Sequence, residues 1–181
     1  VGPWALGRQI QHGLDGLIGV EHAEGWANQL KGEPGLNLIF ERKWRFRTGD
    51  LESDWALEVI PHVGFCLGNV NTQANAGLEV RAGFRLPVDF GTSLIRPTGD
   101  SNPLFRSSFN AFVFVAGDGR AVARDITLDG NTFRDGPSIS RENWVTDTAY
   151  GFGFGGQRWQ VVYTQAYRTK EFELQQDGQE F

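Results

Sequence analysis

The sequence predicts an all-β protein, and two observations support this fold class. The first is composition: 24 glycines and 14 phenylalanines stand beside no methionine in 181 residues, and a chain rich in glycine and aromatic residues favours strands over helices. The second is a hydrophobic period of two that begins near Gly35 and continues through most of the chain. Such a period is expected of strands that have one apolar face. The length fits a single domain, residues 1–181.

Residues 1–26 differ from the rest and predict a short N-terminal helical segment. Apolar residues recur there at helical spacing, at Leu6, Ile10, Leu14, Leu17 and Ile18. Glycines within the segment weaken such a helix, each by roughly 1 kcal/mol relative to alanine. We expect a helix that ends near Gly19 and is stabilised by its surroundings.

Residues 35–172 predict about seven long strands of an antiparallel sheet. Between Leu36 and Arg47, the even positions are mostly apolar or aromatic and the odd positions are mostly charged. The same alternation returns in the segments 55–67, 70–86, 144–155 and 159–167. In residues 144–155 the aromatic residues alternate with small ones, and we expect these small residues to face the opposite way: Gly151, Gly153 and Gly155.

Residues 109–128 predict a hairpin. Two alternating segments, Phe109–Ala116 and Arg120–Leu128, flank the sequence Gly117-Asp118-Gly119. An Asp-Gly pair between two such segments is a strong local signal for a tight turn.

Strand length bears on whether the sheet lies in a membrane. Strands of soluble proteins average about 5–6 residues, whereas a strand that spans a membrane needs about 9–11, with an apolar outer face and a polar lumen. Several of the predicted strands reach the longer range, and the charged face at Glu41, Lys43 and Arg45 suits a lumen or a face in water. The alternation of apolar and polar residues alone leaves two architectures open: a transmembrane β-barrel, and a soluble barrel or sandwich with one solvent-exposed face.

Composition excludes several other classes. A net charge of −5 and a pI near 5.2 argue against a general nucleic-acid binder, which needs clustered Lys and Arg. The single Cys66 excludes an intrachain disulfide and a cysteine-based zinc site. No apolar run approaches the ~18 residues of a membrane helix. The motifs of common serine hydrolases and zinc proteases, G-x-S-x-G and H-E-x-x-H, are also absent from the sequence.

A series of short motifs, taken in order, carries a more specific signal. These are Leu6-Gly7, Gln11, Asp15, Ile18-Gly19, Gly25-Trp26, Asn28-Gln29-Leu30, Glu33-Pro34, Glu41-Arg42-Lys43-Trp44, Leu67-Gly68-Asn69-Val70, Ala74–Gly77 and Tyr163–Phe172. Together they resemble the lipid A 3′-O-deacylase family of Gram-negative outer membranes, and the resemblance covers nearly the whole chain.

The resemblance implies an antiparallel transmembrane β-barrel, twelve-stranded in the family, whose active site lies between the barrel wall and short helices. It implies calcium-dependent hydrolysis that releases the 3′-linked acyloxyacyl group of lipid A. The expected location is the outer membrane of a Gram-negative bacterium, and the expected oligomeric state is a monomer. The chemistry is coherent, because water that attacks an ester needs a positioned base, and the developing oxyanion needs a positive centre. Calcium, a hard cation with oxygen ligands, suits that second role.

The resemblance also assigns residues. Gln11 matches the glutamine of the family's helix, and Glu21 matches the acidic residue near the calcium ion. The position of the catalytic base, which is a histidine in the family, is Asp15 in this chain. An aspartate has an ordinary pKa of about 3.9 against about 6.5 for histidine, which makes it the weaker base unless desolvation raises its pKa. His12 lies on the adjacent helical edge and is a possible substitute.

Length is the second departure from the family. Family members have several strands before the region matched by Val1 and a final strand after the region matched by Phe181. About seven strands are too few for a bacterial barrel, which has an even number of at least eight. We therefore expect part of a larger barrel, or a divergent smaller one. Two other functions stay open beside the deacylase: a catalytically inactive barrel that binds lipid, and a soluble β-barrel that binds a small ligand.

Overall fold

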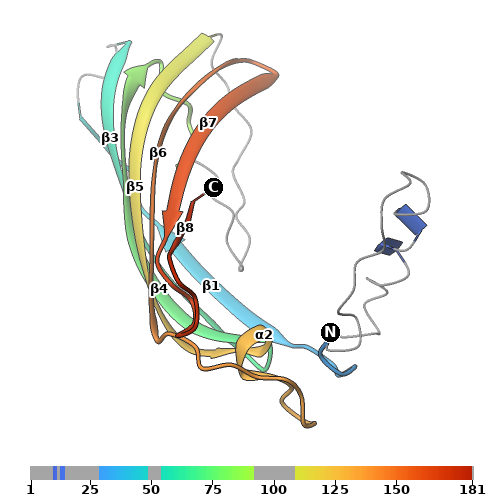
Figure 1. The fold of residues 1–181 in the computed structure, drawn as a ribbon. Helices are drawn as coiled ribbons and strands as arrows, with labels where there is room; N and C mark the ends of the chain where they lie inside the picture. Colours follow the sequence, from blue (N-terminus) through green and yellow to red (C-terminus); the bar gives the residue numbers. More distant parts are fainter. Residues whose placement is uncertain (1–9, 12, 15–28, 49–53, 92–108, 181) are drawn as a thin grey trace.

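The computed structural model describes residues 10–11, 13–14, 29–48, 54–91 and 109–180 of the chain. Its main feature is one antiparallel sheet in the order β1-β3-β4-β5-β6-β7-β8, with β2 also paired to β3. The strands are β1 (Asn37–Lys43), β2 (Phe46–Thr48), β3 (Trp55–Gly68), β4 (Asn71–Phe84), β5 (Phe109–Asp125), β6 (Trp144–Gly156), β7 (Trp159–Arg168) and β8 (Gln179–Glu180). The long strands curve together around a concave side (Figure 1). Among the described residues, no pairing joins β1 to β8, so the sheet is open there.

The predicted all-β antiparallel fold is confirmed. β1 and β2 pair with β3 in one continuous register, from Asn37 opposite Gly68 to Thr48 opposite Leu57. They therefore act as a single interrupted strand, as the alternation over 36–47 predicts. The strands from β3 to β7 are 14, 14, 17, 13 and 10 residues long, so each is long enough to span a membrane, which takes about 9–11 residues.

The hairpin predicted for residues 109–128 is wrong. β5 runs without interruption through Gly117-Asp118-Gly119 for 17 residues, and Asp118 is paired with β4 on one side and β6 on the other. Neither glycine has the positive φ that a tight turn of this kind requires. Ladder pairing on both edges therefore outweighs the local turn preference. The chain leaves the sheet later, in the single helical turn α2 (Ile126–Asp129), whose N-terminus is capped by Asp125.

The two faces of the sheet differ in character. On the outward face, large apolar side chains are exposed, for example Val113 at 60 % and Phe152 at 48 %. Near one end of the sheet an aromatic row crosses five strands, formed by Trp55, Phe84, Phe109, Phe154 and Trp159. Tyr150 and Tyr167 stack on each other farther along β6 and β7. An apolar face with aromatic residues toward its ends is typical of a barrel wall in contact with lipid.

The concave face holds the buried side chains. A small apolar cluster on it consists of Leu86, Phe112, Phe114, Ala116 and Ala149. The glycines of β6 make room for the aromatic rings: a Cβ on Gly153 would lie 2.5 Å from Cζ of Phe112. The prediction that Gly151, Gly153 and Gly155 face away from the aromatic side of β6 is therefore confirmed.

The N-terminal segment is described only in part. Residues 10–11 and 13–14 are helical, in agreement with the prediction at these positions, while the expected end of the helix near Gly19 lies outside the described residues. In the part of the chain that is described, no helix has the length and apolar character to cross a membrane.

Candidate functional site

The site predicted from the sequence falls almost entirely on the N-terminal segment. Of its residues, Gln11 is placed, in a helical and half-buried position. His12, Asp15 and Glu21 lie outside the described residues. The predicted base and the predicted calcium ligand therefore stay predictions.

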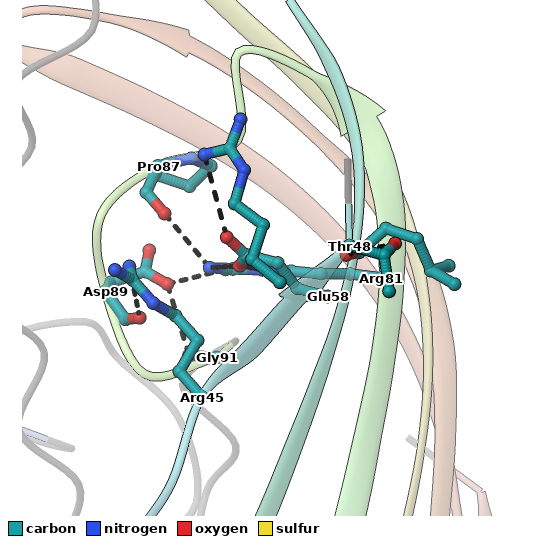
Figure 2. Close-up of polar contacts among 9 residues, drawn as sticks. Arg45, Thr48, Glu58, Arg81, Pro87, Asp89 and Gly91 are labelled. Carbon is teal, nitrogen blue, oxygen red and sulfur yellow. Dashed lines mark hydrogen bonds and ion pairs between the residues drawn. The ribbon is translucent and has the colours of Figure 1, made fainter. Parts of the chain in front are cut away.

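The concave face, in contrast, carries three described clusters of charged side chains. Arg81 on β4 is at the centre of the first (Figure 2). Its Nε and Nη2 donate to Oε2 of Glu58 at 2.9 and 2.6 Å, and its Nη1 donates to Oδ1 of Asp89 at 2.5 Å. The side chains of Arg81 and Glu58 are fully buried. A buried charge of this kind persists only when it is paired and hydrogen-bonded, as it is here.

The first cluster also holds the segment that follows β4 against the concave face. Nη2 of Arg81 donates to the carbonyl oxygen of Pro87 at 3.0 Å, and the backbone N–H of Gly91 donates to Oδ1 of Asp89 at 3.1 Å. Gly91 adopts a φ of +98°, which favours glycine at this bend. Burial raises the pKa of the Asp89 carboxyl, and the adjacent Arg81 guanidinium acts against that rise.

The second cluster joins three strands across the middle of the sheet. Nε2 of His62 on β3 lies 2.5 Å from Oδ2 of Asp118 on β5, and Nδ2 of Asn75 on β4 donates to the same oxygen at 3.1 Å. The histidine reaches across β4 because the intervening residue is Gly77, where a Cβ would lie 2.5 Å from Cε1 of the imidazole. A histidine held by a carboxylate is a familiar proton-transfer unit.

The surroundings of His62 argue against a substrate site at the second cluster. The side chains of His62 and Asp118 are 6 % and 4 % exposed. The neighbouring cavity, lined in part by Lys43, Glu79 and Phe90, has a volume of about 10 Å³. That is near the minimum for a single water molecule and too small for a lipid. We interpret the pair as a clamp between β3 and β5.

The third cluster lies on β5, β6 and β7 and the segment after them. Arg120 is 3.1 Å from a carboxylate oxygen of Asp147, and Nε of Arg168 donates to the other oxygen at 2.6 Å. Arg168 also contacts Glu171 at 3.3 Å. The cations and carboxylates alternate across neighbouring strands, which stabilises the pairing of the last long strands.

The sequence predicts the face of these residues but not their partners. Alternation places Glu58 and His62 on the polar face of their strand and Arg81 on that of the next. The partner of each residue depends on the pairing register, such as Glu58 opposite Arg81 and Gly77 opposite Asp118. The complementary signs of Glu58 and Arg81 on successive strands are the one signal from which their pairing was predictable.

No cluster of acidic side chains marks a metal site in the part of the chain that the structure describes. Among the described residues, no group of three or more His, Cys, Asp or Glu side chains is arranged to hold a metal ion. Calcium usually takes six to eight oxygen ligands. The residue that the resemblance assigns to the ion, Glu21, lies outside the described residues.

Comparisons with known proteins agree with one another. A protein-family model described as "Outer membrane protein LpxR" matches residues 1–181. A solved structure, LpxR from Salmonella typhimurium, aligns with a TM-score of 0.79 at 19 % sequence identity, over 99 % of this chain and 60 % of that one. The chain thus spans about three fifths of the length of that solved protein, and at this identity the likeness shows the fold. No curated protein sequence matches the chain.

Proposed function

Because this chain belongs to the LpxR family of outer membrane proteins, we propose that it is a lipid A deacylase. The reaction is hydrolysis of the ester that holds the 3′-linked acyloxyacyl chain of lipid A. The observation that carries the proposal is the family match over all 181 residues. The exposed apolar face of the sheet supports it, since an enzyme of the outer membrane meets its lipid substrate from within the membrane. An outer-membrane family also favours a membrane barrel over a soluble ligand-binding protein.

In the proposed reaction, the carboxylate of Asp15 takes a proton from water as the water oxygen attacks the ester carbonyl carbon. The bond to the sugar oxygen then breaks, and that oxygen takes up a proton as the alcohol leaves. Gln11 lies four residues before Asp15 and is proposed to orient the water or the ester. His12 is the neighbouring group that is able to share the proton at neutral pH.

Calcium is proposed as the cofactor, with Glu21 as one of its ligands. When bound, calcium would supply the positive charge that stabilises the oxyanion of the tetrahedral intermediate. Further oxygen ligands are needed for a complete coordination sphere, and we propose that other parts of the full-length protein provide them.

A second candidate function is a catalytically inactive relative that binds lipid A without hydrolysing it. The observation that favours it is the aspartate at the position of the base, because Asp15 has a lower ordinary pKa than the histidine of the family.

The test is hydrolysis of purified lipid A by the full-length protein in detergent, with the released acyloxyacyl group measured by mass spectrometry. We expect turnover that requires calcium and falls by about 10²–10⁴-fold in Asp15→Ala, the range for loss of a general base. In Asp15→His we expect the acid limb of the pH–rate profile to move up by about 2.6 pH units, from the difference in ordinary pKa values. A purely structural Asp15 would not move this limb.

The control is Asp135→Ala, which changes an exposed aspartate far along the chain and should leave the rate unchanged. Activity in Asp15→His but not in the natural protein would identify an inactive relative. Absence of activity from both proteins, with calcium present, would contradict the hydrolase proposal.

A further inference from the structure

Arg42 is a charged residue on the apolar, outward face of the sheet. Its register partner on β3 is Val63, which is 43 % exposed. Two neighbours along the chain, Phe40 on β1 and Trp44 just after β1, are 49 % and 36 % exposed. Arg42 itself is exposed. The outward positions of β3, β4, β6 and β7 carry no charged residue, so Arg42 stands out against the wall around it.

Arg42 is held in place by an aromatic ring instead of a carboxylate. Its guanidinium carbon lies 5.4 Å from the centre of the Trp44 ring, at cation–π distance. Within the described part of the chain, Arg42 makes no hydrogen bond through its side chain and no ion pair. The arginines of the concave face differ, because Arg81 and Arg168 are both paired with carboxylates. An arginine side chain that faces lipid destabilises the folded protein unless it pairs with an anionic group.

The depth of Arg42 places it near the polar headgroups. Its partner Val63 lies eight positions after Trp55, which belongs to the aromatic row near one end of the sheet, and Tyr167 likewise lies eight positions after Trp159 of that row. At about 3.3 Å per residue and a tilt of about 40°, eight positions correspond to about 20 Å across the membrane. The apolar band of a barrel is about 25 Å tall. Arg42 is therefore close to the second edge of this band, within reach of headgroups for a long side chain.

We propose that Arg42, at cation–π distance from Trp44, binds the phosphate of a phosphorylated membrane lipid while the exposed residues beside it contact the acyl chains. A guanidinium is planar and able to donate two parallel hydrogen bonds to phosphate oxygens, and the cation–π contact with Trp44 restricts where this guanidinium lies. The phosphate comes from a lipid, because Phe40 and Val63 make the surrounding surface apolar. The inference rests on the outer-membrane placement and not on the proposed hydrolysis.

The experiment compares two lipids that differ only in the phosphate. Full-length protein in detergent is mixed with dioleoyl phosphatidic acid or with dioleoylglycerol, and the retained lipid is counted by native mass spectrometry. We expect Arg42→Gln to bind phosphatidic acid about tenfold more weakly than the natural protein, as for loss of a hydrogen bond to a charged group. Binding of dioleoylglycerol should not change. Arg42→Lys keeps the charge but not the planar pair of donors, and should bind phosphatidic acid about threefold more weakly than the natural protein.

The matched control is Arg158→Gln, since Arg158 is an exposed arginine in the turn between β6 and β7. It should retain phosphatidic acid as the natural protein does. Equal retention of phosphatidic acid by Arg42→Gln and the natural protein would overturn the proposal, as would an equal loss of both lipids. If Arg42→Gln fails to fold, full retention of phosphatidic acid by Arg42→Lys overturns it. No turnover is measured, so this outcome is independent of the deacylase proposal.

Discussion

Arg81 shows how a single residue organises the interior of the sheet. It is fully buried and lies between the carboxylates of Glu58 and Asp89, which are 0 % and 4 % exposed. Its cost of desolvation is offset only because its hydrogen-bond donors meet these two anions and a backbone carbonyl. The residue therefore joins β3, β4 and the segment after β4 through one guanidinium.

Removal of Arg81 should leave the buried carboxylate of Asp89 without its paired cation and that of Glu58 with only the more distant Arg47, at 3.9 Å. We expect Arg81→Leu to lower the free energy of unfolding by about 3–5 kcal/mol, the usual cost of breaking a buried ion pair on one side. The double variant Arg81→Leu with Glu58→Leu should lower the free energy of unfolding by less, because the buried carboxylate of Glu58 is then absent as well. Urea unfolding of the full-length protein in vesicles measures both. Arg85→Leu is the control: its ion pair with Asp54 is exposed, so its loss should cost about 0–1 kcal/mol. Similar values for Arg81→Leu and Arg85→Leu would contradict this interpretation.

At the scale of elements, the segment before β1 is fixed by a segment far along the chain. The carboxylate of Glu33 accepts hydrogen bonds from the backbone N–H groups of Thr132 and Phe133 at 2.9 and 3.1 Å. Lys31 and Asn131 exchange two further hydrogen bonds, each 2.8 Å long. These contacts tie the entry of the sheet to the connection between β5 and β6, about a hundred residues later.

This connection should depend on pH in a defined direction. Burial of Glu33 raises the pKa of its carboxyl, but the hydrogen bonds from Thr132 and Phe133 outweigh this effect and hold the pKa below its ordinary value. A lowered folded-state pKa contributes stability that is present above the ordinary value, about 4.3, and is lost as pH falls through the folded-state pKa. We expect hydrogen exchange at the amides of Thr132 and Phe133 to accelerate as the solution is acidified through this range.

The matched variant is Glu33→Gln, which keeps the shape of the side chain but cannot accept two hydrogen bonds through both terminal atoms. Its exchange rates at the same two amides, corrected for the intrinsic effect of pH, should be faster at neutral pH and nearly flat through the acid range. A natural protein whose corrected rates are equally flat would show that the carboxylate does not stabilise this connection.

The elements also show what a sequence predicts and what it does not. The interrupted strand 36–47 and the faces of residues 144–155 were predictable, because burial on one side imposes a period of two. The turn at Gly117-Asp118-Gly119 was mispredicted, because an isolated Asp-Gly signal contains no information on the two strands that pair with it. The predicted number of strands still equals the number observed among the described residues when β1 and β2 are counted together. This agreement arises because β8 takes the place of the second half of the predicted hairpin.

The candidate site was less predictable than the fold. Gln11, His12, Asp15 and Glu21 rest on a resemblance, and only Gln11 lies among the described residues. The buried clamp of His62 and Asp118 joins residues 56 positions apart, and no local pattern specifies contacts of this kind. They depend on register and on a glycine, Gly77, that leaves space for the imidazole.

At the scale of the whole molecule, the sheet is inverted relative to a soluble protein: charged side chains are buried on the concave face and apolar side chains are exposed on the outer face. This arrangement is stable only if the outer face meets lipid, as expected for a member of an outer-membrane family. Two exposed valines allow a direct test. Val113 lies on the outward face of β5 and is 60 % exposed, whereas Val88 lies in the segment after β4 and is 57 % exposed.

A charge introduced at Val113 should destabilise the folded protein far more than a charge introduced at Val88, although the two side chains are almost equally exposed. Val113 lies four positions from Phe109 of the aromatic row, which is about 10 Å into an apolar band of about 25 Å. We expect Val113→Arg to lower the free energy of unfolding of the protein in vesicles by about 2–4 kcal/mol, as for an arginine near the bilayer midplane. Val88→Arg should change it by about 0.5 kcal/mol or less, as for a surface position in water. Both values come from urea titrations of the full-length protein in the same vesicles. Equal, small effects of the two substitutions would mean that the outer face of β5 lies in water.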